Sequence, residues 1–442
     1  MTTDLEDRLR SDLPRLADHL APPTDAAVLA PDRSVVDLVM PGPAMSARRR
    51  GPRVLLVAAA VVALVATGVV LATRDDGTEG PPRGDTHTST ASAPDSVTTA
   101  PPRNTGHLVG HGEQLPDPPL DERAGSTSVW TGSEWLVFGG HQGSAARQDA
   151  AAYSPATGRW RQLATNPTFA PAAMAVWTGS EVVVLNKADG WTYDVEADRW
   201  RDLPEQAPLT GKGSNDRLQF AGAAWTGNRV VAVGYRLGSD GVSVDLGART
   251  YDPVTGRWGR LRGASDPITA TDASAIVGTA WDGRAIQAWR ADGSGWSFDP
   301  ARSRWTHLPD LVVPRRTPET TTVIAGDGER TYALVATRRN GATVDDLWVF
   351  EAGAWRKVPF ELIGDFPAAE QEAVVAGDEL VVWGTSLRPL AVDLHAGTFR
   401  ALPQRALRGG FDGTALWTGH ELLTVGGRDA DGDLTNHAYR LT

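Results

Sequence analysis

The strongest constraint on the fold of this chain is a short phrase that recurs along it. The sequence VWTGSEWLVFGG occupies residues 129–140, and a close copy, VWTGSEVVVL, occupies residues 176–185. Five looser versions follow, and they begin at positions 223, 279, 323, 374 and 415. A period of about 40–50 residues with several short strands in each unit is typical of a β-propeller, in which every unit forms one blade. The sequence therefore predicts seven blades.

Each unit contains the signals of four antiparallel strands. In the first unit, one strand ends at Trp130 and the next covers 134–138, with the dipeptide Thr-Gly as the hairpin between them. The 134–138 strand is almost entirely apolar, which is expected where neighbouring blades cover both of its faces. A third strand runs to Tyr153, the turn SPATG follows, and a fourth strand covers 159–163.

Two details of the repeats carry a family resemblance. Gly-Gly doublets stand at 139–140 and 426–427, although the other five repeats lack them. A Tyr also recurs seven residues before a Trp, in the pairs Tyr153/Trp160, Tyr193/Trp200 and Tyr251/Trp258. This pattern resembles the kelch repeat of the galactose-oxidase-like propellers over about residues 107–442. It is weaker in the fifth and sixth repeats, where Ala325 and Phe399 stand in place of Trp. The resemblance implies an all-β, seven-bladed kelch-like β-propeller.

The seventh repeat is incomplete at its C-terminal end. The segment HAYRLT, residues 437–442, supplies a third strand, and the chain ends without a fourth. The segment HGEQLPDPPL, residues 111–120, matches the missing strand except for its Trp. We therefore expect the N-terminal segment to complete the last blade, which leaves no open edge between the first and last blades.

An uncharged apolar segment, residues 54–72, precedes the repeats. Its 19 residues reach about 28 Å as a helix, enough to cross the hydrocarbon layer of a bilayer. Four Arg lie within 48–53 and acidic residues follow the segment, so the positive-inside rule predicts a cytoplasmic N-terminus and an extracytoplasmic propeller. A cleaved signal peptide or a twin-arginine signal is the alternative, although signal peptides have shorter apolar cores nearer the N-terminus. Both interpretations predict export of the repeats.

Two further segments flank the predicted transmembrane helix of residues 54–72. Residues 1–53 form the predicted cytoplasmic tail, in which a capping box at Thr3 precedes Leu residues at helical spacing. We expect a short amphipathic helix there, and residues 1–40 either bind a cytoplasmic partner or lie on the inner leaflet. Residues 73–106 are rich in Pro, Ser and Thr, and this composition predicts a disordered linker before the propeller of residues 107–442.

Charge and cysteine content exclude several function classes. The net charge is −11, and residues 1–53 carry equal numbers of acidic and basic side chains, so the whole negative charge belongs to the rest of the chain. An acidic domain without a basic stripe argues against nucleic-acid binding. The chain has no Cys, which excludes disulfides, thiolate metal sites and a Cys nucleophile. The copper-radical chemistry of galactose oxidase requires a Tyr joined to a Cys, so the resemblance does not extend to that activity.

The two faces of the predicted propeller differ in the length of their loops. Connections between first and second strands and between third and fourth strands are short, whereas the others are long and varied, as in residues 141–149, 235–247, 336–346 and 426–436. Long loops on one face of a rigid scaffold usually carry binding. Each blade also offers a cationic or imidazole residue where its second strand ends. The seven are His141, Lys187, Arg236, Arg290, Arg338, Arg388 and Arg428. As a ring, they predict a site for an anionic ligand, such as an acidic glycan or a carboxylate-bearing peptide.

Three functions remain open from the sequence. The first is a non-catalytic membrane-tethered propeller that binds protein or carbohydrate, the second is a hydrolase or lyase that acts on glycans through loop carboxylates, and the third is a sensor coupled to a cytoplasmic partner. No pattern typical of a metal site, a phosphate-binding loop or a nucleophile elbow is present. We therefore predict no cofactor and no metal, and we assign no catalytic residue.

Overall fold

The computed structural model describes residues 108, 110–166, 173–187, 189–206, 217–237, 244–260, 266–270, 276–312, 320–339, 342–364, 371–384, 389–402, 413–429 and 432–442. They belong to the compact unit Ala63–Thr442, and the second unit, Met1–Val62, lies outside them. The predicted tail, transmembrane helix and linker, residues 1–106, also lie outside the described part. Within the described residues every regular element is a strand, and no helix there has the length and apolarity to span a membrane.

Seven antiparallel sheets follow one another along the chain, each with four strands in its main order. The first sheet contains β2 (Thr127–Trp130), β3 (Trp135–Phe138), β6 (Ala150–Ser154) and β7 (Arg159–Leu163). The second contains β8 (Met174–Trp177), β9 (Glu181–Asn186), β10 (Asp189–Asp194) and β11 (Arg199–Asp202). The third contains β12 (Gln219–Trp225), β13 (Val230–Leu237), β14 (Val244–Asp252) and β15 (Arg257–Arg260). The fourth contains β17 (Ile276–Trp281), β18 (Ile286–Arg290), β19 (Gly295–Asp299) and β20 (Arg304–Leu308).

The remaining sheets repeat this order. The fifth contains β21 (Thr321–Gly326), β22 (Thr331–Arg339), β23 (Ala342–Glu351) and β24 (Ala354–Gly364). The sixth contains β25 (Gln371–Ala376), β26 (Glu379–Gly384), β27 (Leu390–Asp393) and β28 (Phe399–Ala401). The seventh contains β29 (Thr414–Trp417), β30 (Leu422–Val425), β31 (Ala438–Leu441) and β1 (Gly112–Gln114). Outside this order, β16 (Asp266–Ala270) pairs with β14, while β4 (His141–Gln142) and β5 (Ala145–Ala146) form a small hairpin.

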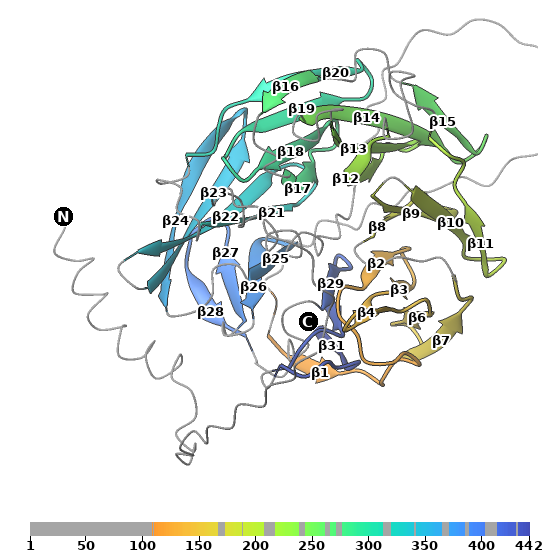
Figure 1. Ribbon diagram of the computed structural model, residues 1–442. Helices are drawn as coiled ribbons and strands as arrows, with labels where there is room; N and C mark the ends of the chain where they lie inside the picture. Colours follow the sequence, from red (N-terminus) through yellow and green to blue (C-terminus); the bar gives the residue numbers. More distant parts are fainter. Residues whose placement is uncertain are drawn as a thin grey trace, which may run out of the picture. The chain divides into compact units, whose positions relative to one another are not determined.

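The seven sheets close into a ring around a common axis (Figure 1). The first strand of each sheet contacts the first strand of the next, from β2 through β8, β12, β17, β21 and β25 to β29, which contacts β2 again. The first strands are therefore innermost, and each sheet extends outward from them. The predicted all-β, seven-bladed propeller is confirmed.

The hydrophobic core lies between neighbouring sheets. Leu136 and Phe138 of β3 pack with residues of the second sheet, whereas Trp135 and Val137 of the same strand pack with residues of the seventh. Successive side chains of a strand point to opposite faces, so an uninterrupted apolar run is required where both faces are covered. All four residues of β3 are fully buried. This arrangement confirms the predicted burial of the second strands.

The Tyr and Trp that recur seven residues apart lie opposite each other on neighbouring strands. Tyr153 of β6 pairs in register with Trp160 of β7, and their ring centroids lie 5.1 Å apart. The indole Nε1 of Trp160 also donates a hydrogen bond of 2.7 Å to the carbonyl oxygen of Pro116, which follows β1 of the preceding sheet. The same bond recurs from Trp200 to Ala164 and from Trp258 to Pro204. Each of these Trp residues links its own sheet to the connection that leaves the previous one.

The N-terminal segment completes the seventh sheet as predicted. Strand β1 pairs antiparallel with β31, with Gly112 opposite Leu441 and Gln114 opposite Tyr439. A main-chain hydrogen bond of 2.9 Å from Leu115 N to Ala438 O extends the pairing, and the guanidinium of Arg440 binds the carboxylate of Glu113 at 2.6 Å. The seventh sheet thus has four strands drawn from both ends of the described chain.

Two details differ from the sequence prediction. Residues 336–346, predicted as a long loop, instead lie largely in β22 and β23, which leave only residues 340–341 between them. The Asn-Gly dipeptide at those positions is a signal for a two-residue hairpin, and this signal outweighs the polarity of the segment. In the same sheet, Gly326 rather than Ala325 occupies the position of Trp130, because Gly326 and Trp130 both end the first strand before an equivalent hairpin.

Candidate functional site

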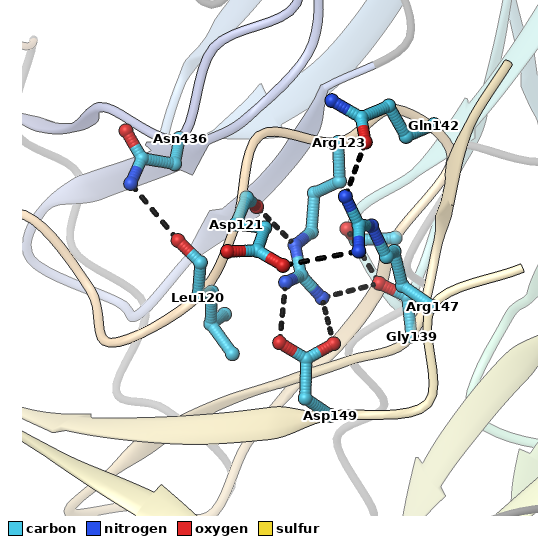
Figure 2. A network of polar contacts seen from close by, with 9 residues as sticks. Leu120, Asp121, Arg123, Gly139, Gln142, Arg147, Asp149 and Asn436 are labelled. Atoms are coloured by element: carbon cyan, nitrogen blue, oxygen red, sulfur yellow. Dashed lines mark hydrogen bonds and ion pairs between the residues drawn. The ribbon is translucent and has the colours of Figure 1, made fainter. Parts of the chain in front are cut away.

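Three segments of the long-loop face meet where the first and seventh sheets adjoin, a boundary that we call the seam. They are the connection from β1 to β2 (115–126), the loop from β3 to β6 (139–149) and the loop from β30 to β31 (426–437). Between them lies a hollow of about 430 Å³. It is lined by Leu120, Asp121, Glu122, Gln142, Arg147 and Asn436. We take this hollow as the candidate site (Figure 2).

The buried guanidinium of Arg123 organises the segment beside the hollow. Its side chain is 1 % exposed. Nη1 and Nη2 donate to the two carboxylate oxygens of Asp149 at 2.9 and 2.6 Å, which is the bidentate geometry that makes such pairs strong. Nη1 also donates to the carbonyl of Gly139, and Nε donates to the carbonyl of Asp121 (Figure 2). Arg123 therefore fixes its own connection against the loop of the first sheet.

The main chain of Arg123 binds the other side of the seam. Arg123 N donates to Thr435 O at 3.3 Å, and its carbonyl accepts a hydrogen bond of 2.8 Å from Gly427 N. Gly426 makes this approach possible, because it has a φ of +71° and a Cβ there would lie 2.9 Å from the Arg123 carbonyl oxygen. One residue thus joins the first and seventh sheets, through its side chain on one side and its backbone on the other.

The Gly-Gly doublets lie against this connection from both sides. Gly140 has a φ of +99°, and a Cβ on it would meet the carbonyl oxygen of Ala124 at 2.6 Å, far inside van der Waals contact. The second doublet, 426–427, contacts Arg123 as described above. The doublets therefore occur in the first and last repeats because these two repeats enclose the same segment.

The rim of the hollow consists of polar side chains that bind one another. Arg147 Nη1 lies 3.0 Å from Asp121 Oδ2, and Arg147 Nη2 donates to the side-chain carbonyl of Gln142. On the opposite side, Asn436 Nδ2 donates to Leu120 O at 2.9 Å. Figure 2 shows Asp121 and Arg147 between Asn436 and Gln142. The arrangement presents carboxylate, amide and guanidinium groups side by side.

Protonation beside the hollow is governed by the Arg123–Asp149 pair. Partial burial raises the pKa of the Asp149 carboxyl, but the hydrogen bonds and charge of Arg123 outweigh it, so the pKa lies below its ordinary value. Asp149 therefore stays ionised near neutral pH and holds Arg123 in place.

Carboxyl groups with raised pKa values lie elsewhere in the described part of the chain. Burial raises the pKa of Glu181 and of Glu421 more than their nearby guanidinium groups, Arg201 and Arg440, lower it. Both residues stand where a second strand begins, on the short-loop face. Neither can serve as a general acid at the hollow. Within the described residues, no group of three or more His, Asp and Glu side chains is placed to hold a metal ion.

The predicted cationic positions fall where second strands end, on the long-loop face. His141 lies in β4 just after β3, Lys187 directly follows β9, and Arg428 follows β30. Arg236 and Arg338 lie near the ends of β13 and β22, where the structure describes the backbone alone, and Arg388 lies outside the described residues. The second strand of each sheet lies one strand spacing, about 4.8 Å, farther from the axis than the first strand. A ring at the ends of the second strands therefore lies at some distance from the axis and does not line the central channel. The anion site stays a prediction.

Four members of this set have described contacts, and His141 Nδ1 lies 3.1 Å from the carbonyl oxygen of Gly143 in the hairpin of β4 and β5. Lys187 is exposed, with its carbonyl bound by Phe220 N. Arg428 donates to the carbonyl of Gly432 at 3.1 Å within its own loop. Arg290 differs from these three, because it is 9 % exposed, lies over the ring of Trp296 and is 3.6 Å from Asp292. Arg290 therefore packs within the fourth sheet and contributes to its stability.

The comparisons with protein families and with curated proteins find no relative of the chain. No protein-family model matches it, and no curated protein matches it. The site must therefore be interpreted from its own geometry.

Sequence analysis missed Arg123 and the hollow beside it. Arg123 stands seven residues before Trp130, and the corresponding position of the third repeat, relative to Trp225, is the buried Leu218. An alignment of the repeats emphasises the residues that they share, so a charged residue that occurs in one repeat alone is easily overlooked. The usable signal was a single Arg in residues 115–126, together with the two Gly-Gly doublets that enclose this connection.

Proposed function

We propose that this chain is a membrane-tethered extracytoplasmic propeller that binds protein or carbohydrate through its long-loop face. The observation that carries this proposal is the polar hollow at the seam, which opens among long loops beside the ion pair of buried Arg123 and half-buried Asp149. Rigid scaffolds that present irregular loops on one face commonly act as interaction modules. The closed ring of seven sheets is consistent with that role.

The tethering part of the proposal comes from the sequence. Residues 54–72 anchor the chain, the Arg residues of 48–53 keep residues 1–53 in the cytoplasm, and the propeller lies outside. Residues 1–40 contact a cytoplasmic partner. Reporter fusions after residue 50 and after residue 106 test this topology, because only the second reporter is then active outside the cytoplasm.

A binding survey tests the functional part. The full-length chain, purified in a mild detergent, is applied to arrays of glycans and of peptides, and retained ligands are analysed for cleavage products. Retention without cleavage supports a binding module. Turnover of a retained glycan contradicts it and favours a hydrolase or lyase, and retention of no ligand on either array contradicts the proposed function altogether.

A further inference from the structure

The hollow at the seam is an open, polar depression with one ordered side. It has a volume of about 430 Å³, and Asp121, Glu122 and Gln142 on its rim are exposed to solvent. The four side-chain hydrogen bonds of Arg123 and the two main-chain bonds to the seventh sheet fix the segment that forms one wall. A wall that is already ordered loses little conformational entropy when a ligand binds.

The lining of the hollow selects the chemistry of its ligand. Gln142 and Asn436 each use one polar group for a contact within the protein, and the remaining Gln142 Nε2 and Asn436 Oδ1 have no partner within the described residues. Asp121 is 70 % exposed, and its carboxylate retains acceptor capacity beyond the contact with Arg147. The free groups therefore include both donors and acceptors.

Other ligand classes fit this lining poorly. An apolar ligand covers these polar groups without replacing their hydrogen bonds to water, which is unfavourable. An anion faces the carboxylates of Asp121 and Glu122 with only Arg147 as a cation. A metal ion competes with the guanidinium of Arg147 for the oxygen atoms of Asp121 and Gln142.

We infer that the hollow binds an uncharged, hydroxyl-rich ring, such as one neutral sugar unit of a glycan. A hydroxyl group donates one hydrogen bond and accepts others, so neighbouring sugar hydroxyls match a surface on which carboxylate, amide and guanidinium groups alternate. The Asp121–Arg147 pair is partly exposed, and such pairs contribute little to stability, so both side chains can turn toward a ligand. This inference rests on the proposed function and specifies which class of carbohydrate the face recognises.

Glycan binding by single-residue variants tests the inference. The full-length chain in detergent is applied to an array of neutral, uronic-acid and sulfated glycans, and the dissociation constants of retained glycans are measured by calorimetry. Neutral glycans are expected to be retained. Gln142→Ala and Asp121→Ala each remove one hydrogen-bonding group, so each is expected to weaken binding roughly 3- to 10-fold.

The matched control is Gln162→Ala, which removes an exposed Gln from β7 of the same sheet, away from the hollow. This variant is expected to bind with unchanged affinity. Unchanged affinity in Gln142→Ala and Asp121→Ala overturns the inference but leaves the propeller a carbohydrate-binding module at another place. Retention of acidic glycans alone, or of peptides alone, also overturns the inference and leaves the proposed function standing.

Discussion

Removal of the Arg123 side chain is the sharpest test of how the ring is closed. Arg123→Ala deletes four hydrogen bonds and leaves the carboxylate of Asp149 without its cation. Loss of one partner from a buried ion pair costs about 3–5 kcal/mol. Asp149 is 25 % exposed, so water partly solvates its charge and the expected cost is about 3 kcal/mol. With a urea dependence of about 3 kcal/mol per M, the unfolding midpoint falls by about 1 M.

The assay is urea unfolding of the full-length chain in detergent, followed by tryptophan fluorescence. The matched control is Arg161→Ala in the same sheet, where Arg161 is 42 % exposed and binds Glu134, which is 23 % exposed. Such a surface pair contributes about 0–1 kcal/mol, so the control midpoint should barely move. Hydrogen exchange adds a local readout, because Arg123→Ala should expose amides of β1 and β31 first. Equal midpoints for the two variants, with unchanged exchange in β1, would refute the argument.

Four further outcomes follow from the same geometry. Deletion of residues 108–118 removes β1, so it should cause aggregation or a large drop in melting temperature, and an unchanged melting curve contradicts the closure. Gly140→Ala should destabilise the fold by about 3 kcal/mol more than Gly143→Ala, since both have positive φ but only Gly140 faces a close carbonyl; equal melting temperatures contradict this. The pKa of Asp149 is lowered in the folded state, so ionised Asp149 stabilises the fold above about pH 4, and this stabilisation is lost as the pH falls through the folded pKa. In Asp149→Asn, the free energy of unfolding should therefore fall less between about pH 5 and pH 2 than in the unchanged chain. Lys187→Glu combined with Arg428→Glu should reduce retention of uronic-acid glycans if the cationic ring binds anions, and Arg290 is left intact because it packs against Trp296.

Repetition explains which parts of the fold were predictable. Seven copies of a hairpin signal establish the number of sheets, and the apolar run of 134–138 is a direct consequence of burial on both faces. The closing strand was predictable because the last repeat lacks a fourth strand and the segment 111–120 supplies one. The loop lengths were less predictable, since strand extension in β22 and β23 depends on cross-strand pairing rather than on local polarity.

The candidate site belongs to the part that repetition cannot predict. All seven sheet boundaries are crossed by a connection from a fourth strand to the next first strand, but only the seventh sheet also joins the two ends of the described chain, through the pairing of β1 with β31. That extra demand is met by Arg123, its partner Asp149 and the two Gly-Gly doublets. The doublets look like remnants of a degraded consensus when the repeats are aligned. In the structure they mark the boundary where loops of the first and seventh sheets lie close enough together to form the hollow. In this ring of repeated sheets, the boundary that joins the two ends of the described chain departs from the repeat, and the candidate site lies there.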